Sequence, residues 1–471
     1  MTAIYRFARD LRLDDHAGLS AAAAHGEIVP VLVIDRALSE RLSISPRRAA
    51  YFCGAVAALD VLLRERGSRL IVRRGPVGST LRRLARSTGA SAVAWAAGYD
   101  RRAMRDDERL QSLLEEAGIA AMRVHDAPAI APEDTSAARP SGGDGYRAFV
   151  PYFEVWRDQP VASFEQPLLQ RFARSDVESE TLPQPSEFAS ACRSPDAGPA
   201  AASTALRRFL EGPALQYAAA ANVPADDRTS HLSVHLSFGA IGARTVVRET
   251  GRRSEDAFLL AEERRSLKLY LRSLALRDFF LQLSWYHPET HDVALQEKMR
   301  DFSFARSHDA LEAWAAGRTG HPLVDAGMRQ LRETGWMHPR VRAIAASFLC
   351  FDLAVDWAVG RACWDALLAE DDFAVATGNW QWVAGVGADM AQYPRIYNPR
   401  KQGRQLDPAG AYARRWIAEL ANVPGRGLFA GVRNSRQLGL ALFSHDAYPQ
   451  PVVDHERAAR AFLTRYRAAR A

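Results

Sequence analysis

The first third of the chain alternates short apolar runs with segments of helical periodicity, and no other feature constrains its fold as strongly. The apolar runs have the length of strands, and the helical segments fall between them. The strand segments are residues 3–7, 28–34, 70–72 and 92–95, and the helical segments are residues 19–25, 48–66 and 79–88. Strands that alternate with helices build a parallel sheet covered on both faces. The sequence therefore predicts a doubly wound, Rossmann-like α/β domain, although no GxGxxG fingerprint follows the first strand to indicate a dinucleotide site.

The pattern changes twice further along the chain. From about residue 128 to residue 202, prolines, glycines, serines and acidic residues interrupt the periodicity, as in a connector. Beyond residue 203, helical periodicity dominates, for example over residues 257–286 and 341–359. We therefore predict an α/β domain over residues 1–127, a linker over residues 128–202 and an all-helical domain over residues 203–471.

Composition limits the classes of protein to which the chain can belong. Hydrophobic residues make up 48% and charged residues 25%, as in soluble globular proteins, and no apolar run is long enough to span a bilayer. Charges follow Met1 without an apolar stretch of signal-peptide length, so we expect a cytoplasmic protein without a membrane partner. The four cysteines form no CxxC pair, which argues against zinc or iron–sulfur sites, and we expect no metal. The net charge of +6 permits nucleic-acid binding without demonstrating it.

Three segments carry polar and aromatic residues where a helical core would have leucine. Thr229–Gly239 has four hydroxyls and two histidines, and hydroxyls with free backbone N–H groups at a helix start can bind phosphate. Arg318–Arg342 combines arginines and histidines with two carboxylates, and Glu370–Trp382 ends in Trp-Gln-Trp. From spacing alone, each segment also has an ordinary explanation: a helix cap, surface ion pairs or core tryptophans.

Together these segments resemble the signatures of the DNA photolyase/cryptochrome family. Phe7–Leu13 is similar to the family's opening FRRDLR, and Gly145–Phe153 is similar to its GxxYxxFTPF segment. TSHLSVHLSFG, TGHPLVDAGMRQL, GWMHPR, NWQW and RIYNP then follow in the family's order. The resemblance covers nearly the whole chain and is to class I cyclobutane pyrimidine dimer photolyases, with an altered lesion pocket.

The resemblance implies a blue-light flavoprotein in which an α/β antenna domain precedes a helical domain that binds FAD in a bent form. The positions that match the family's FAD-binding residues are Tyr217, Thr229, Ser230, His231, Leu232, Ser233, Arg277, Asp278, Arg342, Glu370 and Asp372. Of these, Arg342 and Glu370 should form an ion pair beside the isoalloxazine ring, where the family usually has aspartate instead of Glu370. A second, antenna chromophore of folate or deazaflavin type is compatible with the resemblance, and residues 98–102 do not identify it.

Three tryptophans match the positions that pass an electron from the protein surface to the excited flavin in the family. They are Trp314, Trp357 and Trp380. An indole is comparatively easy to oxidise, so a row of closely spaced indoles can serve as a hopping path. Three core aromatics are the ordinary alternative. We favour the relay because all three family positions are kept, and we predict photoreduction of the bound flavin.

The lesion pocket departs from the family's pattern. Members that split cyclobutane dimers have a glutamate and a tryptophan where this chain has Ser273 and Leu276. Pro339 and Ala343 replace an asparagine and a methionine that usually flank the lesion, and Ala376 replaces the asparagine that faces flavin N5. Serine is an effectively non-acidic donor, and losing an indole removes roughly 1–3 kcal/mol of stacking per base. We therefore expect a less polar pocket.

DNA remains an expected partner, because Arg340 and Gln402 match family DNA-contact positions. We predict a monomeric carbon–carbon lyase, a deoxyribodipyrimidine photo-lyase, that splits pyrimidine dimers by electron transfer from excited reduced FAD. The alternative is a cryptochrome-like photoreceptor without repair activity. The altered pocket favours this alternative, and the absence of a long extension beyond Tyr466 disfavours it. A light-independent FAD oxidoreductase would leave the tryptophan relay unexplained.

Overall fold

The chain folds into two compact units in a computed structural model. Unit 1 consists of residues 1–215, 230–288 and 369–375, and unit 2 consists of residues 216–229, 289–368 and 376–471. The structure describes residues 1–139, 143–164, 171–173, 177–193, 195–304, 308–388, 394–429 and 448–470. In these ranges, no helix has both the length and the apolar character needed to cross a membrane.

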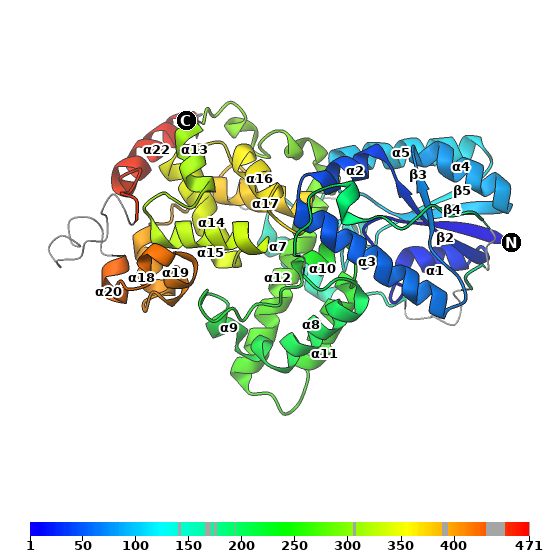
Figure 1. The fold of residues 1–471 in the computed structure, drawn as a ribbon, viewed down its shortest axis with the longest axis horizontal. Coiled ribbons are helices and arrows are strands. Elements are labelled where there is room, and N and C mark those ends of the chain that lie inside the picture. Colours follow the sequence, from blue (N-terminus) through cyan, green and yellow to red (C-terminus); the bar gives the residue numbers. More distant parts are fainter. Residues whose placement is uncertain are drawn as a thin grey trace. The chain divides into compact units, whose positions relative to one another are not determined.

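Unit 1 contains a parallel sheet of five strands in the order β3-β2-β1-β4-β5 (Figure 1). The strands are β1 (Thr2–Phe7), β2 (Glu27–Ile34), β3 (Ile71–Arg74), β4 (Ala90–Ala96) and β5 (Ala120–Val124). In register, Ile4 of the central strand β1 lies opposite Val29 of β2 and Val93 of β4. The predicted doubly wound sheet is confirmed. The sequence analysis missed β5 because this edge strand is half-exposed and has no continuous apolar run.

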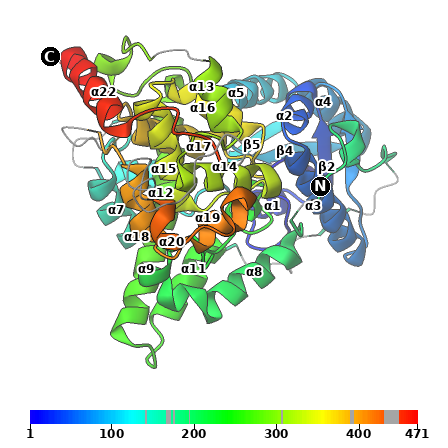
Figure 2. The same ribbon diagram turned by 60° about the vertical axis from the view of Figure 1, so that its left-hand side comes forward.

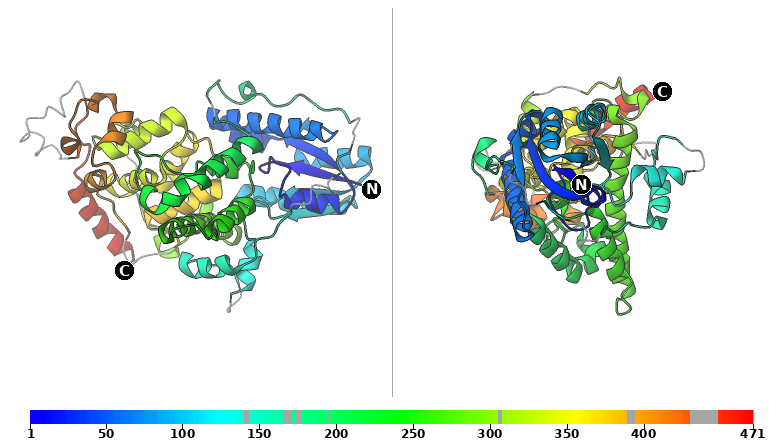
Figure 3. Two further views of the ribbon diagram at one scale, coloured as in Figure 1. Left: turned by 90° about the horizontal axis from the view of Figure 1, so that it is seen from below. Right: turned by 90° about the vertical axis from the view of Figure 1, so that its right-hand side faces the viewer.

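Helices cover both faces of the sheet (Figure 3). Tyr5 and Phe7 of β1 point to the face packed by α1 (Ala17–Ala23) and α3 (Pro46–Glu65). Ile4 points to the opposite face, where α4 (Val77–Thr88) and α5 (Arg101–Glu116) pack. Successive side chains of a strand alternate between faces, so a strand buried on both sides must be apolar throughout. This requirement explains the apolar runs in the sequence.

The rest of unit 1 combines helices with irregular segments, and it includes the predicted linker. Two short helices, α6 (Pro132–Ala137) and α7 (Phe149–Asp158), lie within that linker, and α8 (Pro199–Glu211) begins at its end. Further on, α10 (Ser233–Ser237) and α11 (Ala243–Ser254) precede the long helix α12 (Ala261–Tyr286). Helices α11 and α12 pack against each other (Figure 2). The domain boundaries at residues 127 and 202 stay a prediction.

Unit 2 is helical and has its own apolar core. Several of its helices begin with proline in the first turn, where the missing N–H has no intrahelical partner to lose. A π-helical turn, Phe348–Asp352, continues α15. The helices named in unit 2 are α9 (Tyr217–Ala220), α13 (His308–Ala315), α14 (Pro322–Thr334), α15 (Pro339–Ser347), α16 (Trp357–Asp365), α18 (Pro399–Leu406), α19 (Ala411–Trp416), α20 (Gly425–Leu428) and α22 (His455–Arg470). Helix α17 (Phe373–Ala384) begins in unit 1 and continues into unit 2.

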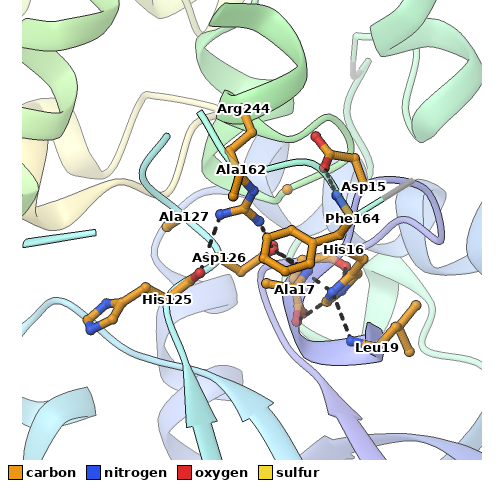
Figure 4. Close-up of polar contacts among 12 residues, drawn as sticks. Asp15, His16, Ala17, Leu19, His125, Asp126, Ala127, Ala162, Phe164 and Arg244 are labelled. Atoms are coloured by element: carbon orange, nitrogen blue, oxygen red, sulfur yellow. Dashed lines mark hydrogen bonds and ion pairs between the residues drawn. The ribbon is translucent and has the colours of Figure 1, made fainter. Parts of the chain in front are cut away.

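A buried carboxylate, Asp126, joins three separate segments of unit 1 (Figure 4). Arg12, which follows β1, donates to Asp126 Oδ2 at 2.8 Å and to Oδ1 at 2.9 Å. Arg244 on α11 donates to the same Oδ1 from the other side and lies 5.0 Å from the centre of the Phe164 ring. Burial by itself would raise the pKa of Asp126, but the two arginines hold it far below its usual range. The cluster ties the sheet to the helical part of unit 1.

We predict that Asp126→Ala lowers the free energy of unfolding by about 3–5 kcal/mol, because it leaves two buried guanidinium groups without their common partner. Urea unfolding at neutral pH, followed by circular dichroism, measures this change. The control is Glu249→Ala, which removes an exposed partner of Arg252 on the same helix as Arg244 and should change stability little. Equal midpoints for the two variants would contradict the assignment.

Candidate functional site

The residues predicted to bind FAD fall in both units. Unit 1 holds Ser230, His231, Leu232, Ser233, Arg277, Asp278, Glu370 and Asp372. Unit 2 holds Tyr217, Thr229 and Arg342. The expected ion pair between Arg342 and Glu370 therefore joins residues of different units and stays a prediction.

Unit 1 brings together Arg277 and Asp372, two predicted flavin residues that are far apart in the sequence. Arg277 Nη2 on α12 lies 3.2 Å from Asp372 Oδ2 in the segment that precedes α17. Arg277 Nη1 also donates to the carbonyl of Ala127 at 2.8 Å. Burial raises the pKa of Asp372, and the positive charge of Arg277 opposes that rise. The pair presents a partly exposed carboxylate held by a fixed guanidinium.

The neighbouring Asp278 is buried and bonded to the predicted linker. Its Oδ2 accepts hydrogen bonds from the backbone N–H groups of Ala129 at 2.8 Å and Ile130 at 3.2 Å, and from Trp156 Nε1 at 3.0 Å. Burial raises the pKa of Asp278 to about 6, against the lowering effect of Arg277. These bonds fix the linker against α12. A contact of Asp278 with the flavin stays a prediction.

Asp371, which the sequence analysis did not select, anchors the segment between Glu370 and Asp372. Arg9 Nη1 donates to the Asp371 carbonyl at 3.0 Å, and Arg41 from α2 (Arg36–Ser43) donates to its carboxylate. The fully buried Arg48 donates through Nη2 to the Glu370 carbonyl at 2.9 Å. Although burial opposes it, these arginines hold the pKa of Asp371 well below its usual range. Three consecutive carboxylates were the available sequence signal, but the arginine partners of Asp371 lie more than 300 positions away.

The hydroxyl-rich segment 229–233 is an irregular loop over residues 229–232 and enters the short helix α10 at Ser233. Thr229 Oγ1 is buried without a hydrogen-bond partner among the residues that the structure describes. His231 has a positive φ of 53°, an uncommon conformation for a residue other than glycine. A buried hydroxyl normally has a partner, so Thr229 fits a ligand that brings polar atoms, as FAD does with its phosphates and ribityl hydroxyls. The exposed Ser233 begins the helix.

Two of the predicted relay tryptophans lie in an indole cluster inside unit 2, together with a third that the sequence analysis missed. The ring centroids of Trp314 and Trp380 are 6.3 Å apart. Trp364 lies 5.8 Å from Trp314 and 4.5 Å from Trp380, so it contacts both rings. Trp364 follows Trp357 by seven residues, or two turns of α16, and this spacing was the sequence signal for a shared helix face.

The three tryptophans of the predicted relay are all buried. Trp314 is completely buried, and its Nε1 donates to the Ala345 carbonyl at 3.0 Å. Trp357 is buried as well and lies 5.2 Å beneath the guanidinium of Arg361. The Trp314 ring therefore does not itself touch solvent. The participation of the three predicted tryptophans in a relay stays a prediction.

The residues predicted to face DNA or its lesion are also divided between the units. In unit 2, Arg340 Nη2 donates to Gln402 Oε1 at 3.0 Å, so the structure brings these two predicted DNA contacts together. Pro339 is exposed in the first turn of the same helix. In unit 1, Ser273 is exposed and donates its hydroxyl to the Tyr270 carbonyl at 2.7 Å, one turn before the half-buried Leu276.

The burial of Asp278 predicts a pH dependence of stability that Asp278→Asn removes, because asparagine keeps an acceptor oxygen but cannot ionise. The folded pKa of about 6 exceeds the unfolded value of about 3.9, so between them the folded protein holds a proton that the unfolded chain has lost. The free energy of unfolding of the wild type should therefore fall relative to the variant from about pH 4 to about pH 6, by about 3 kcal/mol at most, and then level off. Urea unfolding of both proteins across this range measures the difference. A difference that does not change with pH would contradict the assignment.

Comparison with known proteins agrees with this arrangement over the whole chain. The family models for "DNA photolyase" and "FAD binding domain of DNA photolyase" match residues 3–168 and 270–468. The chain is 37% identical to a deoxyribodipyrimidine photo-lyase of Streptomyces griseus over 96% of both chains, and 34% identical to one of Halobacterium salinarum over 95% of both. The crystal structure of a class III photolyase from Agrobacterium tumefaciens superposes with a TM-score of 0.87 at 30% identity, covering 100% of this chain and 98% of that one. This chain is therefore a member of the DNA photolyase family, with an α/β domain followed by a helical FAD-binding domain.

Proposed function

We propose that the protein splits pyrimidine dimers in DNA in a light-dependent reaction, as a deoxyribodipyrimidine photo-lyase. The observation that carries this proposal is an identity of 34–37% to proteins of that name over nearly the full length of each chain, combined with an FAD-binding domain. When bound, FAD supplies the absorption of light and the electron that opens the dimer. The proposed mechanism needs no covalent nucleophile, and the residues assigned to the site supply ion pairs, hydroxyls and indoles instead.

The residues of this chain would hold and orient the cofactor. The Arg277–Asp372 pair offers one positive and one negative group, and the buried Thr229 hydroxyl has no hydrogen-bond partner in the described part of the chain. The Arg340–Gln402 pair supports the assignment of a DNA-facing surface, because guanidinium groups bind phosphate oxygens. We assign the enzyme to the cytoplasm on the grounds given by its sequence.

The lesion pocket is the observation that favours the second candidate, a photoreceptor without repair activity. The Ser273 hydroxyl is already donated to its own helix, so it is poorly placed to donate to the carbonyls of a dimer. Leu276 cannot stack on a base as an indole does, which removes roughly 1–3 kcal/mol of binding. Repair by this protein would therefore depend on electron transfer with little help from a proton donor at position 273.

The repair prediction is tested with purified protein whose flavin has been photoreduced. Blue light should remove cyclobutane dimers from a dimer-containing oligonucleotide, in single-stranded or duplex form, and chromatography of the digested product measures this loss. The same mixture kept in the dark is the control and should show none. Intact dimers after illumination of both substrates would refute the lyase and leave the photoreceptor.

The indole cluster predicts that Trp380→Phe slows photoreduction of the bound flavin, because phenylalanine is harder to oxidise than tryptophan. Each additional 1.4 kcal/mol of barrier slows a step by about tenfold, and we expect a loss of at least about that size. Trp364→Phe should also slow the reaction if electrons pass through its ring. The control is Trp416→Phe, which alters a half-buried indole elsewhere in unit 2. Absorption spectra taken after successive periods of blue light measure the rate of flavin photoreduction. A Trp380→Phe protein that is photoreduced as fast as wild type would contradict the relay.

A further inference from the structure

Three side chains of unit 1 form a hydrogen-bonded row that leads from a buried phenol to a surface carboxylate. Tyr99 follows β4, His125 follows the adjacent strand β5, and Glu133 lies in α6. Tyr99 and His125 therefore meet at the carboxyl edge of the parallel sheet, where ligands and functional groups of such sheets gather. His125 points away from the buried cluster of its neighbour Asp126 (Figure 4).

The carboxylate at one end of the row sets the direction of its hydrogen bonds, because an ionised carboxylate can only accept. The Tyr99 hydroxyl and His125 Nδ1 share a hydrogen bond, whose direction depends on the tautomer of the imidazole. His125 Nε2 lies 3.0 Å from Glu133 Oε2 and 3.2 Å from Oε1, so an N–H at this position donates to the carboxylate. This arrangement selects the imidazole tautomer whose Nδ1 lone pair is free to accept the phenolic proton.

Burial falls steadily along the row. Tyr99 is 3% exposed, whereas the side chains of His125 and Glu133 are 20% and 52% exposed. Burial raises the pKa of Tyr99 well above its usual value, so the phenol is neutral at rest. The pKa of Glu133 is lowered, since its hydrogen bonds to His125 and Trp285 outweigh the effect of burial. A proton leaving the phenol therefore has a base beside it and a carboxylate near water behind that base.

The row lies close to the predicted flavin residues of unit 1. Tyr99 packs against Leu281 of α12 and against Ala374, which comes two residues after Asp372. The charges of Arg277 and Asp278 both act on the Tyr99 hydroxyl. The Trp285 ring lies 5.7 Å from Tyr99 and 4.7 Å from His125, which keeps the phenol in aromatic surroundings.

We propose that Tyr99 is a proton-coupled electron donor to the photoexcited flavin, separate from the indole cluster of unit 2, with His125 and Glu133 as its proton acceptors. This inference rests on the proposed FAD-dependent function. One electron leaves the phenol for the excited oxidised cofactor, and the hydroxyl proton moves to His125 Nδ1. The products in the protein are a neutral phenoxyl radical and an imidazolium whose charge Glu133 offsets. The electron and the proton return together in the dark, or an added thiol reduces the radical.

Tyr152 is a matched control for Tyr99, because it is a buried tyrosine of the same unit whose hydroxyl has no base beside it. Tyr152 is as deeply buried in unit 1 and also feels the charge of Asp278. Its hydroxyl has no hydrogen-bond partner in the described part of the chain. Oxidation of Tyr152 would therefore leave the phenolic proton without a base.

The first experiment identifies the radical. FAD-loaded, oxidised protein is illuminated without added reductant, frozen and examined by high-field electron paramagnetic resonance, in the wild-type and Trp380→Phe backgrounds. We expect a tyrosyl signal that Tyr99→Phe abolishes and Tyr152→Phe preserves, and in the Trp380→Phe background we expect Tyr99→Phe to remove most of the residual photoreduction. A tyrosyl signal that survives Tyr99→Phe, or no such signal while the flavin is photoreduced, overturns the proposal. A protein that binds no flavin would instead refute the proposed function itself.

The second experiment needs no flavin. Nitrogen NMR of the full-length protein, labelled with ¹⁵N-histidine, reports which ring nitrogen of His125 carries the proton, and His125→Gln identifies its signals. We expect a proton on Nε2 and a non-protonated Nδ1 whose shift changes in Tyr99→Phe. A proton on Nδ1, or a spectrum unaffected by Tyr99→Phe, would contradict the direction of the row.

Discussion

The organisation of unit 1 depends on the pairing of the buried Asp126 carboxylate with two arginines. Arg12 arrives from the end of β1 and Arg244 from α11, so a single side chain connects the sheet with the helices. A carboxylate is costly to bury, and only partners on both sides can offset the loss of water. This requirement restricts the positions that the three segments can take relative to one another.

A second buried carboxylate paired with arginines lies in unit 1 near the predicted flavin residues. Asp371 is buried among three arginines from the α/β part, and the backbone of Glu370 accepts from Arg48. The Arg277–Asp372 pair then fixes the end of this segment against α12. Ion pairs with arginines distant in sequence thus hold residues 370–372 in place, and together they restrict the backbone of this segment. A cofactor site benefits from such rigidity because its groups are placed before the ligand binds.

The two units contain different groups for redox chemistry. In unit 2, Trp314, Trp364 and Trp380 are packed together and buried, which suits the transfer of electrons without protons. In unit 1, the Tyr99–His125–Glu133 row can move a proton as well, because it combines a phenol, a base and a carboxylate of rising exposure. Excited FAD, held by the FAD-binding domain, would be the oxidant for the indole cluster and for the tyrosine row alike. In the predicted lesion pocket, Ser273 stands where the family has an acidic donor, and its hydroxyl donates to the Tyr270 carbonyl.

The sequence by itself determined the α/β layer, the helical second part and the family, because strand and helix periodicity and contiguous motifs are local properties. It also selected Arg277 and Asp372 as flavin residues, and the tertiary structure places their side chains in contact. Only the tertiary structure decided the partners of Asp126 and Asp371, the position of Trp364 between two other indoles, the complete burial of Trp314 and the row that begins at Tyr99. These contacts join residues up to hundreds of positions apart. No periodicity in one segment specifies which distant side chain will neutralise its charge or accept its proton.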